Sequence, residues 1–192
     1  MYIVFEGIDG AGKSTQIRML KEWLEANGFR VETLVEPTDS EVGKLIRKIL
    51  EWPDAQTDDV QRILALLFAA DRMLIMDKLE DESKIIISDR SFISSLAYQE
   101  PREWVEVLNK YAKKPDLLIL LDLDVKKSVG RTSGKDTFEN EKFLTGVKAN
   151  YLKIAENYTH EIIDANNGVN KVSSDIKKAV APYLGICPDC IQ

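Results

Sequence analysis

Eight residues near the start of the chain have a spacing, G-x-x-x-x-G-K-[ST], that binds phosphate: Gly7-Ile8-Asp9-Gly10-Ala11-Gly12-Lys13-Ser14. The loop follows an apolar run and precedes a helical pattern, which is the setting that the mechanism needs. Its glycines permit a tight turn that points backbone N–H groups at an anion, and the following helix adds its positive dipole end. We expect Lys13 to reach the β- and γ-phosphates of a nucleoside triphosphate and the Ser14 hydroxyl to ligate Mg²⁺. The alternative, a glycine turn with a chance lysine, does not account for this setting.

Two further patterns separate the classes of protein that carry such a loop. A GTPase usually has [NT]-K-x-D after a strand, whereas residues 109–112 lack the aspartate and precede an apolar run. A motor ATPase usually ends a strand in two acids, but two apolar runs here end in the single aspartates Asp89 and Asp122. Either aspartate fits the Mg²⁺ shell or the cap of a following helix. A small kinase fits these patterns better than a GTPase or a motor.

Three arginines are placed to hold a second, phosphorylated substrate, because a guanidinium matches a phosphate. Arg72 lies four residues after Phe68 on one helix face, so the pair either holds a flat base or consists of a core ring and a surface charge. Arg90 directly follows an apolar run, and Arg131 opens the most polar segment, residues 131–141. That segment has the composition of a loop that closes over phosphates.

The elements that must position these side chains alternate along the chain. Short apolar runs predict strands at residues 3–5, 29–35, 85–87, 117–121 and 161–164. Helical spacing predicts helices at residues 14–27, 41–50, 59–80, 142–156 and 172–183, and the third of these has a core stripe of Val60, Ile63, Leu64, Leu67 and Leu74. Strands without polar alternation are buried on both faces, so we expect an α/β fold with a parallel sheet whose carboxyl edge binds ligands.

Composition restricts the partners and the location of the protein. The 192 residues carry a net charge of −6, so the chain is not expected to cover a nucleic-acid backbone. The longest apolar run, residues 63–70, is too short to span a membrane, and the first residues have no basic stretch typical of a secretion signal. Two cysteines exclude a disulfide framework. We expect a cytoplasmic protein with one domain over residues 1–192, including a lid at 131–141 and a tail at 185–192.

Three motifs, in order and in spacing, resemble the thymidylate kinase family of P-loop nucleoside monophosphate kinases. They are residues 5–16 around the phosphate loop, residues 67–72 with Phe68 and Arg72, and residues 87–99, which read Ile-Ser-Asp-Arg and then Ser-Ser-Leu-Ala-Tyr-Gln. In the last motif Ser95, Tyr98 and Gln99 share one face of an expected helix. The resemblance covers about residues 1–184. It implies a five-stranded parallel sheet flanked by helices, with a short lid.

The resemblance also implies a function and its residues. The reaction is transfer of the γ-phosphate of ATP to dTMP, giving dTDP and ADP for dTTP synthesis, with Mg²⁺ and in a homodimer. The implied ATP contacts are Gly7, Ile8, Asp9, Gly10, Ala11, Gly12, Lys13, Ser14, Thr15 and Arg131. The implied dTMP contacts are Asp9, Glu36, Pro37, Arg47, Phe68, Arg72, Arg90, Ser95, Tyr98 and Gln99. The implied catalytic residues are Lys13, Arg90, Asp9 and Arg131. The implied metal ligands are Ser14, Asp9 and Asp89.

Departures from the family pattern concern the lid. Many members have an arginine where this chain reads Thr137, and Gly10 after Asp9 resembles the group whose lid supplies the catalytic cation. Arg131 and Lys135 are the candidates for that cation, and Arg131 is favoured.

The two cysteines of the tail, at positions 187 and 190, form a local disulfide, remain two thiols or supply half a metal site, and they have no assigned function. A deoxynucleoside kinase and a non-catalytic nucleotide sensor are the alternative functions.

Overall fold

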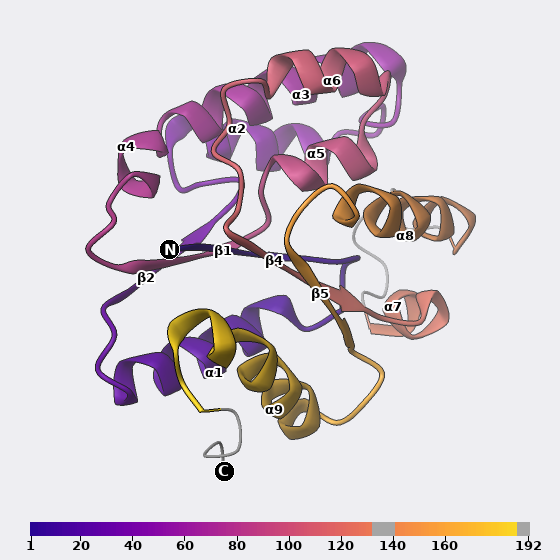
Figure 1. The fold of residues 1–192 in the computed structure, drawn as a ribbon. Coiled ribbons are helices and arrows are strands. Elements are labelled where there is room, and N and C mark those ends of the chain that lie inside the picture. The colour runs from indigo at the N-terminus through magenta and orange to yellow at the C-terminus, as the bar shows by residue number, and fades with distance from the viewer. Residues whose placement is uncertain (132–140, 188–192) are drawn as a thin grey trace.

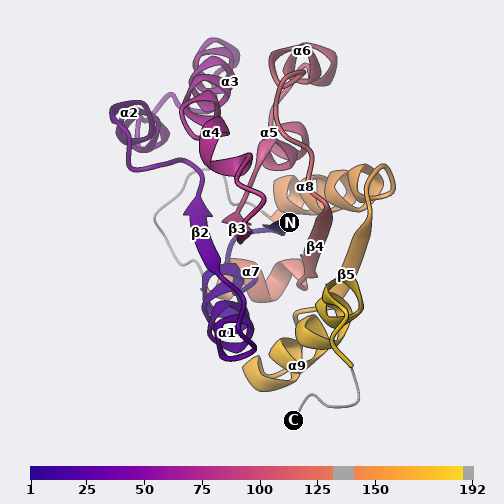
Figure 2. The same ribbon diagram turned by 60° about the vertical axis from the view of Figure 1, so that its left-hand side comes forward.

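The computed structural model describes residues 1–131 and 141–187, which form one parallel sheet with helices on both faces (Figures 1 and 2). The strand order is β2 (Val31–Val35), β3 (Ile85–Asp89), β1 (Tyr2–Glu6), β4 (Leu117–Asp122) and β5 (His160–Asp164). All four strand pairings are parallel, as the alternating pattern predicts. The predicted α/β class with a five-stranded parallel sheet is therefore confirmed.

The helices form two layers around this sheet. In Figure 1, α1 and α9 lie on one face, and α2 to α6 lie with α8 on the other. The helices are α1 (Lys13–Ala26), α2 (Glu41–Leu50), α3 (Asp58–Met73), α4 (Met76–Leu79), α5 (Phe92–Tyr98), α6 (Arg102–Leu108), α7 (Val125–Arg131), α8 (Glu141–Ala155) and α9 (Val169–Val180), followed by a 3₁₀ turn, η1 (Ala181–Leu184). Among the described residues, none of these is both long and apolar enough to cross a membrane.

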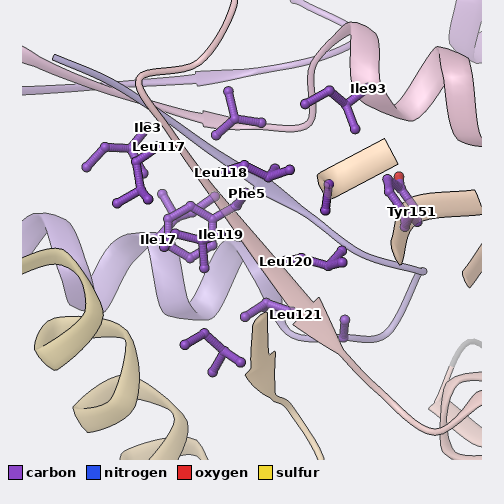
Figure 3. Close-up of a cluster of buried hydrophobic side chains, with 14 of the residues drawn as sticks. Ile3, Phe5, Ile17, Ile93, Leu117, Leu118, Ile119, Leu120, Leu121 and Tyr151 are labelled. Atoms are coloured by element: carbon purple, nitrogen blue, oxygen red, sulfur yellow. The ribbon is translucent and has the colours of Figure 1, made fainter. Parts of the chain in front are cut away.

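The core lies where the three central strands meet the helices. Every residue of β1 and β3 is buried, and in β4 only the last residue is partly exposed. Figure 3 shows Phe5 of β1, Ile17 of α1 and Ile119 of β4 gathered on the face of the sheet that α1 covers. Burying apolar side chains on both faces fixes these strands, so that their carboxyl ends, where the polar residues follow, lie along one edge.

The sequence-based expectations were wrong in four respects. The helix expected over 59–80 ends at Met73, and α4 follows, because the non-helical backbone at Ile75 lets that side chain and Leu79 turn into the core. Two residues of its expected core stripe, Ile63 and Leu74, are 44% and 61% exposed. The edge strands β2 and β5 are only partly buried, since each has a neighbouring strand on one side alone. The helices α6 and α7 were not expected.

Candidate active site

The loop between β1 and α1 forms the phosphate cradle that the sequence predicts. Gly7 has φ +140°, and a Cβ there would lie 2.6 Å from the carbonyl oxygen of Leu121, so only glycine fits. Gly12, at φ +90°, begins helix α1. The Ser14 hydroxyl donates to Asp89 Oδ2 at 2.7 Å, which joins the loop to the end of β3. Because two hard oxygen ligands meet beside the cradle, this pair fits a Mg²⁺ ion that also binds phosphate.

Lys13 is folded back over the loop. Its ammonium donates to the carbonyl oxygens of Gly7 at 2.9 Å and Ile8 at 3.3 Å, and it lies 3.8 Å from the Asp9 carboxylate. Burial, and next the charge of Arg90, lower the pKa of Lys13 from 10.5 to about 8. A phosphate in the cradle favours the charged form, so the lysine is prepared to bind an anion.

Arg90 follows β3 and reaches across the sheet edge to the loop after β1. Its Nη2 forms an ion pair with the Asp9 carboxylate, and its guanidinium carbon lies 5.5 Å from the centre of the Tyr98 ring. Arg90 is the single non-glycine residue of the described chain with a positive φ, at 72°. The cation therefore stands between the phosphate loop and the cavity described next.

A cavity of about 190 Å³ opens beside the phosphate loop and is lined by residues of α2, α3, α5 and α8 and of the loops that follow β1, β2 and β3. Nine sequence-predicted site residues line it: Asp9, Glu36, Pro37, Phe68, Arg72, Arg90, Ser95, Tyr98 and Gln99. Aromatic rings and a few polar groups in a small cavity fit a planar base with its sugar. The cavity thus has a cationic end at Arg90 and a ring-lined end at Phe68.

Arg72 is buried rather than a surface charge, at 3% exposure. Its Nε and Nη2 donate to the Glu36 carboxylate at 2.9 and 2.6 Å, and its Nη1 donates to Asn109. A guanidinium carries five N–H donors, so donor capacity remains for a ligand in the cavity. Glu36 is equally buried, and burial raises its pKa while the Arg72 charge opposes that rise. Glu36 and Asn109 therefore hold the arginine in one orientation.

Side chains of two helices, α2 and α3, hold the segment that carries Pro37 through hydrogen bonds. Asp71 of α3 accepts from the Thr38 backbone N–H at 2.7 Å and from the Thr38 and Ser40 hydroxyls at 2.6 Å each. Arg47 of α2 donates to the Pro37 and Thr38 carbonyl oxygens at 2.7 Å each. Arg47 was expected in the acceptor pocket, but it is not among the described residues that line the cavity. It supports this segment instead.

The remaining predicted residues have definite positions. Arg131, the last residue of α7, donates from Nη1 to the Gly10 carbonyl oxygen at 2.9 Å, and Ser128 of the same helix donates to the Asp9 carbonyl oxygen at 2.6 Å. Asp122, the alternative metal residue, instead pairs with Lys148 at 2.5 Å. Thr15 is exposed in the first turn of α1, whereas Ala11 and Ile8 are buried within the loop. Residues 132–140, with Lys135 and most of the expected lid, lie outside the described residues.

Sequence reasoning did not find several residues that hold the site. The cavity also contains Leu50, Gln61, Leu64, Ser91, Ser94 and Phe143. Behind it, Glu6 accepts from Ser94 and from Tyr151 of α8, a residue 145 positions away in sequence. Such long-range contacts leave no local signal. One local signal was present for α7: Asp124 accepts from the backbone N–H of Lys126, in the pattern of a helix N-cap.

A P-loop beside a base-sized cavity, with the partly buried cation Arg90 between them, is the arrangement of a P-loop nucleotide kinase. Comparison with known proteins identifies the kind of kinase. The thymidylate kinase family model matches residues 5–176, so the chain belongs to the thymidylate kinase family. Its 192 residues are 76% identical to a probable thymidylate kinase of Methanobrevibacter smithii, with all of both chains covered. A second relative, a probable thymidylate kinase of Methanothermobacter thermautotrophicus, is 47% identical over 97% of each chain.

The solved structures agree on the fold. The thymidylate kinase of Candida albicans superposes with a TM-score of 0.81 at 24% identity, covering 95% of this chain and 92% of that one. Family membership and full-length similarity make the chain a nucleoside monophosphate kinase, a phosphotransferase that converts dTMP to dTDP at the expense of ATP.

Proposed function

We propose that the site divides this transfer between the phosphate loop, which holds ATP, and the cavity, which holds dTMP. The supporting observation is that one cavity is lined both by Asp9 and Arg90, beside the phosphate loop, and by Phe68 and Arg72. A monophosphate at the Arg90 end has its oxygen directed at the γ-phosphate, and alignment of the two is the main task of such an enzyme.

The base end fits thymine by stacking and hydrogen bonding. Phe68 supplies a flat apolar surface, and Arg72 donates to a base carbonyl from an orientation that Glu36 and Asn109 fix. Tyr98 crowds the 2′ position of the sugar and so favours deoxyribose, while Gln99 and Ser95 lie along the nucleoside. The side-chain oxygen Oε1 of Gln99 is buried without a hydrogen-bond partner among the described residues, so a ligand donor satisfies it.

The phosphate end neutralises charge. Lys13 and the loop N–H groups bind the ATP phosphates, and Arg90 contacts the acceptor phosphate and the group in transfer. Ser14 and Asp89 are the residues that hold Mg²⁺, which supplies charge neutralisation on the phosphates when it is bound. Asp9 exchanges its ion pair with Arg90 for a contact with the sugar or with the metal shell. Arg131, already at Gly10, is the proposed catalytic cation of the lid.

The test is ADP release across the nucleoside monophosphates, measured with a coupled assay at fixed ATP·Mg²⁺. We expect turnover with dTMP, much weaker turnover with AMP and GMP, and none with thymidine, whose hydroxyl acceptor needs a carboxylate base. ADP release with AMP or GMP, but not with dTMP, contradicts the proposal. Release that ignores every acceptor indicates a nucleotide sensor or a simple ATPase.

We also propose a homodimer that buries the outer face of α2 and α3. The helices α2 and α3 and the residue that follows α3 expose Leu45, Ile63, Leu66, Met73 and Leu74, each at 43% or more, and exposed apolar side chains favour a partner. Light scattering at micromolar concentration is expected to give twice the 21.8 kDa chain mass. A single domain, a cytoplasmic location and the absence of a nucleic-acid partner remain the accompanying predictions.

A further inference from the structure

Glu6, the last residue of β1, is a fully buried carboxylate to which the roles proposed above assign nothing. Its Oε1 accepts from the backbone N–H groups of Ser91 and Ser94 at 2.9 and 3.1 Å and from the Ser91 hydroxyl at 2.9 Å. Its Oε2 accepts from the Ser94 hydroxyl at 2.6 Å and from the Tyr151 hydroxyl at 2.9 Å. All five groups donate to it, which is the environment of an ionised carboxylate.

Two of these hydroxyls also contact Arg90. Its Nη1 donates to Ser94 Oγ at 3.0 Å and to the Tyr151 hydroxyl oxygen at 3.2 Å. The backbone of Arg90 is in the left-handed region, at φ 72°, which residues other than glycine rarely adopt. This backbone holds because Arg90 N–H donates to the Phe5 carbonyl oxygen at 3.0 Å and the Ser88 hydroxyl donates to the Arg90 carbonyl oxygen at 2.7 Å. Both the backbone and the side chain of Arg90 are thus fixed.

The chemistry of these groups limits the direction of each hydroxyl proton. A carboxylate only accepts and a guanidinium only donates, whereas a hydroxyl does both. The Ser94 and Tyr151 hydroxyl oxygens also lie 2.8 Å from each other, and either can donate to the other. At least one of the two therefore directs its proton at Glu6, and both direct lone pairs at Arg90. The carboxylate acts on the arginine through two oriented hydroxyls, in a water-excluded part of the site where such dipoles are strong.

Glu6 differs from Asp9 in what a substrate does to it. Asp9 is 40% exposed at its side chain and faces the cleft, so an incoming phosphate competes with it for Arg90. Glu6 has no exposed surface and stays in place. Burial raises the pKa of Glu6, while the charge of Arg90 and the hydrogen bonds from Ser94, Ser91 and Tyr151 oppose that rise. Glu6 therefore remains a fixed acceptor behind Arg90 through the reaction.

We propose that Glu6 is a positioning residue, which aims the Arg90 guanidinium at the transferred phosphoryl group by orienting the hydroxyls of Ser94 and Tyr151. This inference rests on the proposed role of Arg90. It concerns the second layer of the site, three elements that meet behind the cavity: β1, α5 and α8. Glu6 touches neither nucleotide in this arrangement.

Glu6→Gln tests the polarity of this network with almost no change in shape. The amide oxygen keeps the two backbone N–H groups that hold the start of α5, so the amide NH₂ takes the place of Oε2. It then donates to both hydroxyls. One hydroxyl proton turns to the other hydroxyl, and the second is left facing a guanidinium that cannot accept it. We expect kcat for dTMP to fall about 10²-fold, on the scale of a lost transition-state donor, and KM for dTMP to change less than threefold.

Tyr151→Phe provides a second, independent arm, because it removes one hydroxyl and keeps the ring in the core. We expect kcat of Tyr151→Phe to fall about tenfold. In the double variant E6Q/Y151F, we expect the fold-decrease in kcat to be smaller than the product of the two single fold-decreases. Glu32→Gln is the matched control, since Glu32 is another strand carboxylate, paired with Lys84 at 2.7 Å and far from the cleft. It is expected to keep the wild-type kcat.

Wild-type kcat in a folded E6Q, or effects of E6Q and Y151F that multiply, overturns the inference. A rise of about 10²-fold in KM for dTMP with kcat unchanged also overturns it, because a merely structural defect in the cavity gives that result. If E6Q does not fold, Ser94→Ala and Tyr151→Phe decide, and wild-type kcat in both refutes the network. A failure of dTMP as substrate is distinguishable, because E6Q then still lowers kcat for whichever acceptor the wild type uses.

Discussion

Burial of the charged Lys13 lowers the free energy of unfolding of the nucleotide-free protein, and the size of this effect depends on pH. The pKa of this buried ammonium falls from 10.5 to about 8, chiefly because burial penalises the charged form. Below pH 8 the lysine is charged in both the folded and the unfolded chain, so the cost is fully present. Between pH 8 and 10.5 the folded chain releases its proton first, the unfolded chain binds more protons, and stability rises with pH.

The magnitude follows from this difference of 2.5 pKa units. At about 1.36 kcal/mol per unit, the charged lysine costs about 3 kcal/mol, of which about 2 kcal/mol is recovered between pH 7 and 9.5. Lys13→Met removes the titrating group and keeps the apolar stem. The free energy of unfolding of the wild type is therefore expected to rise by about 2 kcal/mol relative to that of Lys13→Met over this interval.

The assay is urea unfolding of the nucleotide-free protein at fixed ionic strength, from pH 7 to 9.5, followed by circular dichroism. Groups shared by both proteins titrate in both, so the difference between the two curves isolates Lys13. Lys48→Met, at an exposed lysine of α2, is the matched control and is expected to give a curve parallel to the wild type. Parallel curves for Lys13→Met and the wild type refute the reasoning, since they show that Lys13 titrates alike in the folded and unfolded chains.

Three further substitutions test the proposed roles. Tyr98→Ala opens the 2′ side of the cavity, so the preference for dUMP over UMP, measured as a ratio of kcat/KM, is expected to fall about tenfold; an unchanged ratio removes that role. Arg131→Ala withdraws a cation beside Gly10 and is expected to lower kcat about tenfold or more, whereas wild-type kcat moves the role to Lys135 or elsewhere. Glu36→Gln leaves the buried charge of Arg72 without its ionic partner, so unfolding free energy is expected to fall by about 3 kcal/mol and KM for dTMP to rise. Urea unfolding and steady-state kinetics measure these two quantities. If neither the unfolding free energy nor KM changes, Glu36 does not hold Arg72 in its orientation.

The phosphate loop was predictable because all of its chemistry is contiguous. Glycines, lysine and serine within eight residues specify a cradle whatever the rest of the chain does. The central strands β1, β3 and β4 were predictable for a related reason, because apolar runs buried on both faces have no polar alternation. The three motifs of the resemblance likewise brought seven of the nine predicted lining residues to one cavity, although their roles stay predictions.

Which side chains contact one another in the site was not predictable in the same way. Arg72 had two interpretations, a base contact or a surface charge, and only the fold shows it buried against Glu36, which lies 36 positions earlier in the chain. The break after Met73 also follows from packing rather than from a glycine or proline at that point. Asn109, the residue that ends α6 as its C-cap, accepts a hydrogen bond from Arg72, and no spacing pattern links those two residues.

The sequence by itself determined that this chain has a nucleotide cradle, a parallel sheet and the cations of a kinase. The tertiary structure alone decided which carboxylate meets which cation. Asp89 and Asp122 end the two strands that flank β1, so strand order alone does not choose between them. The path of the loop into α1 brings Ser14 to Asp89, whereas Lys148 of α8 pairs with Asp122. The physical reason is that a local pattern sets the type and face of a side chain, whereas the packing of loops and helices against the sheet sets its neighbours.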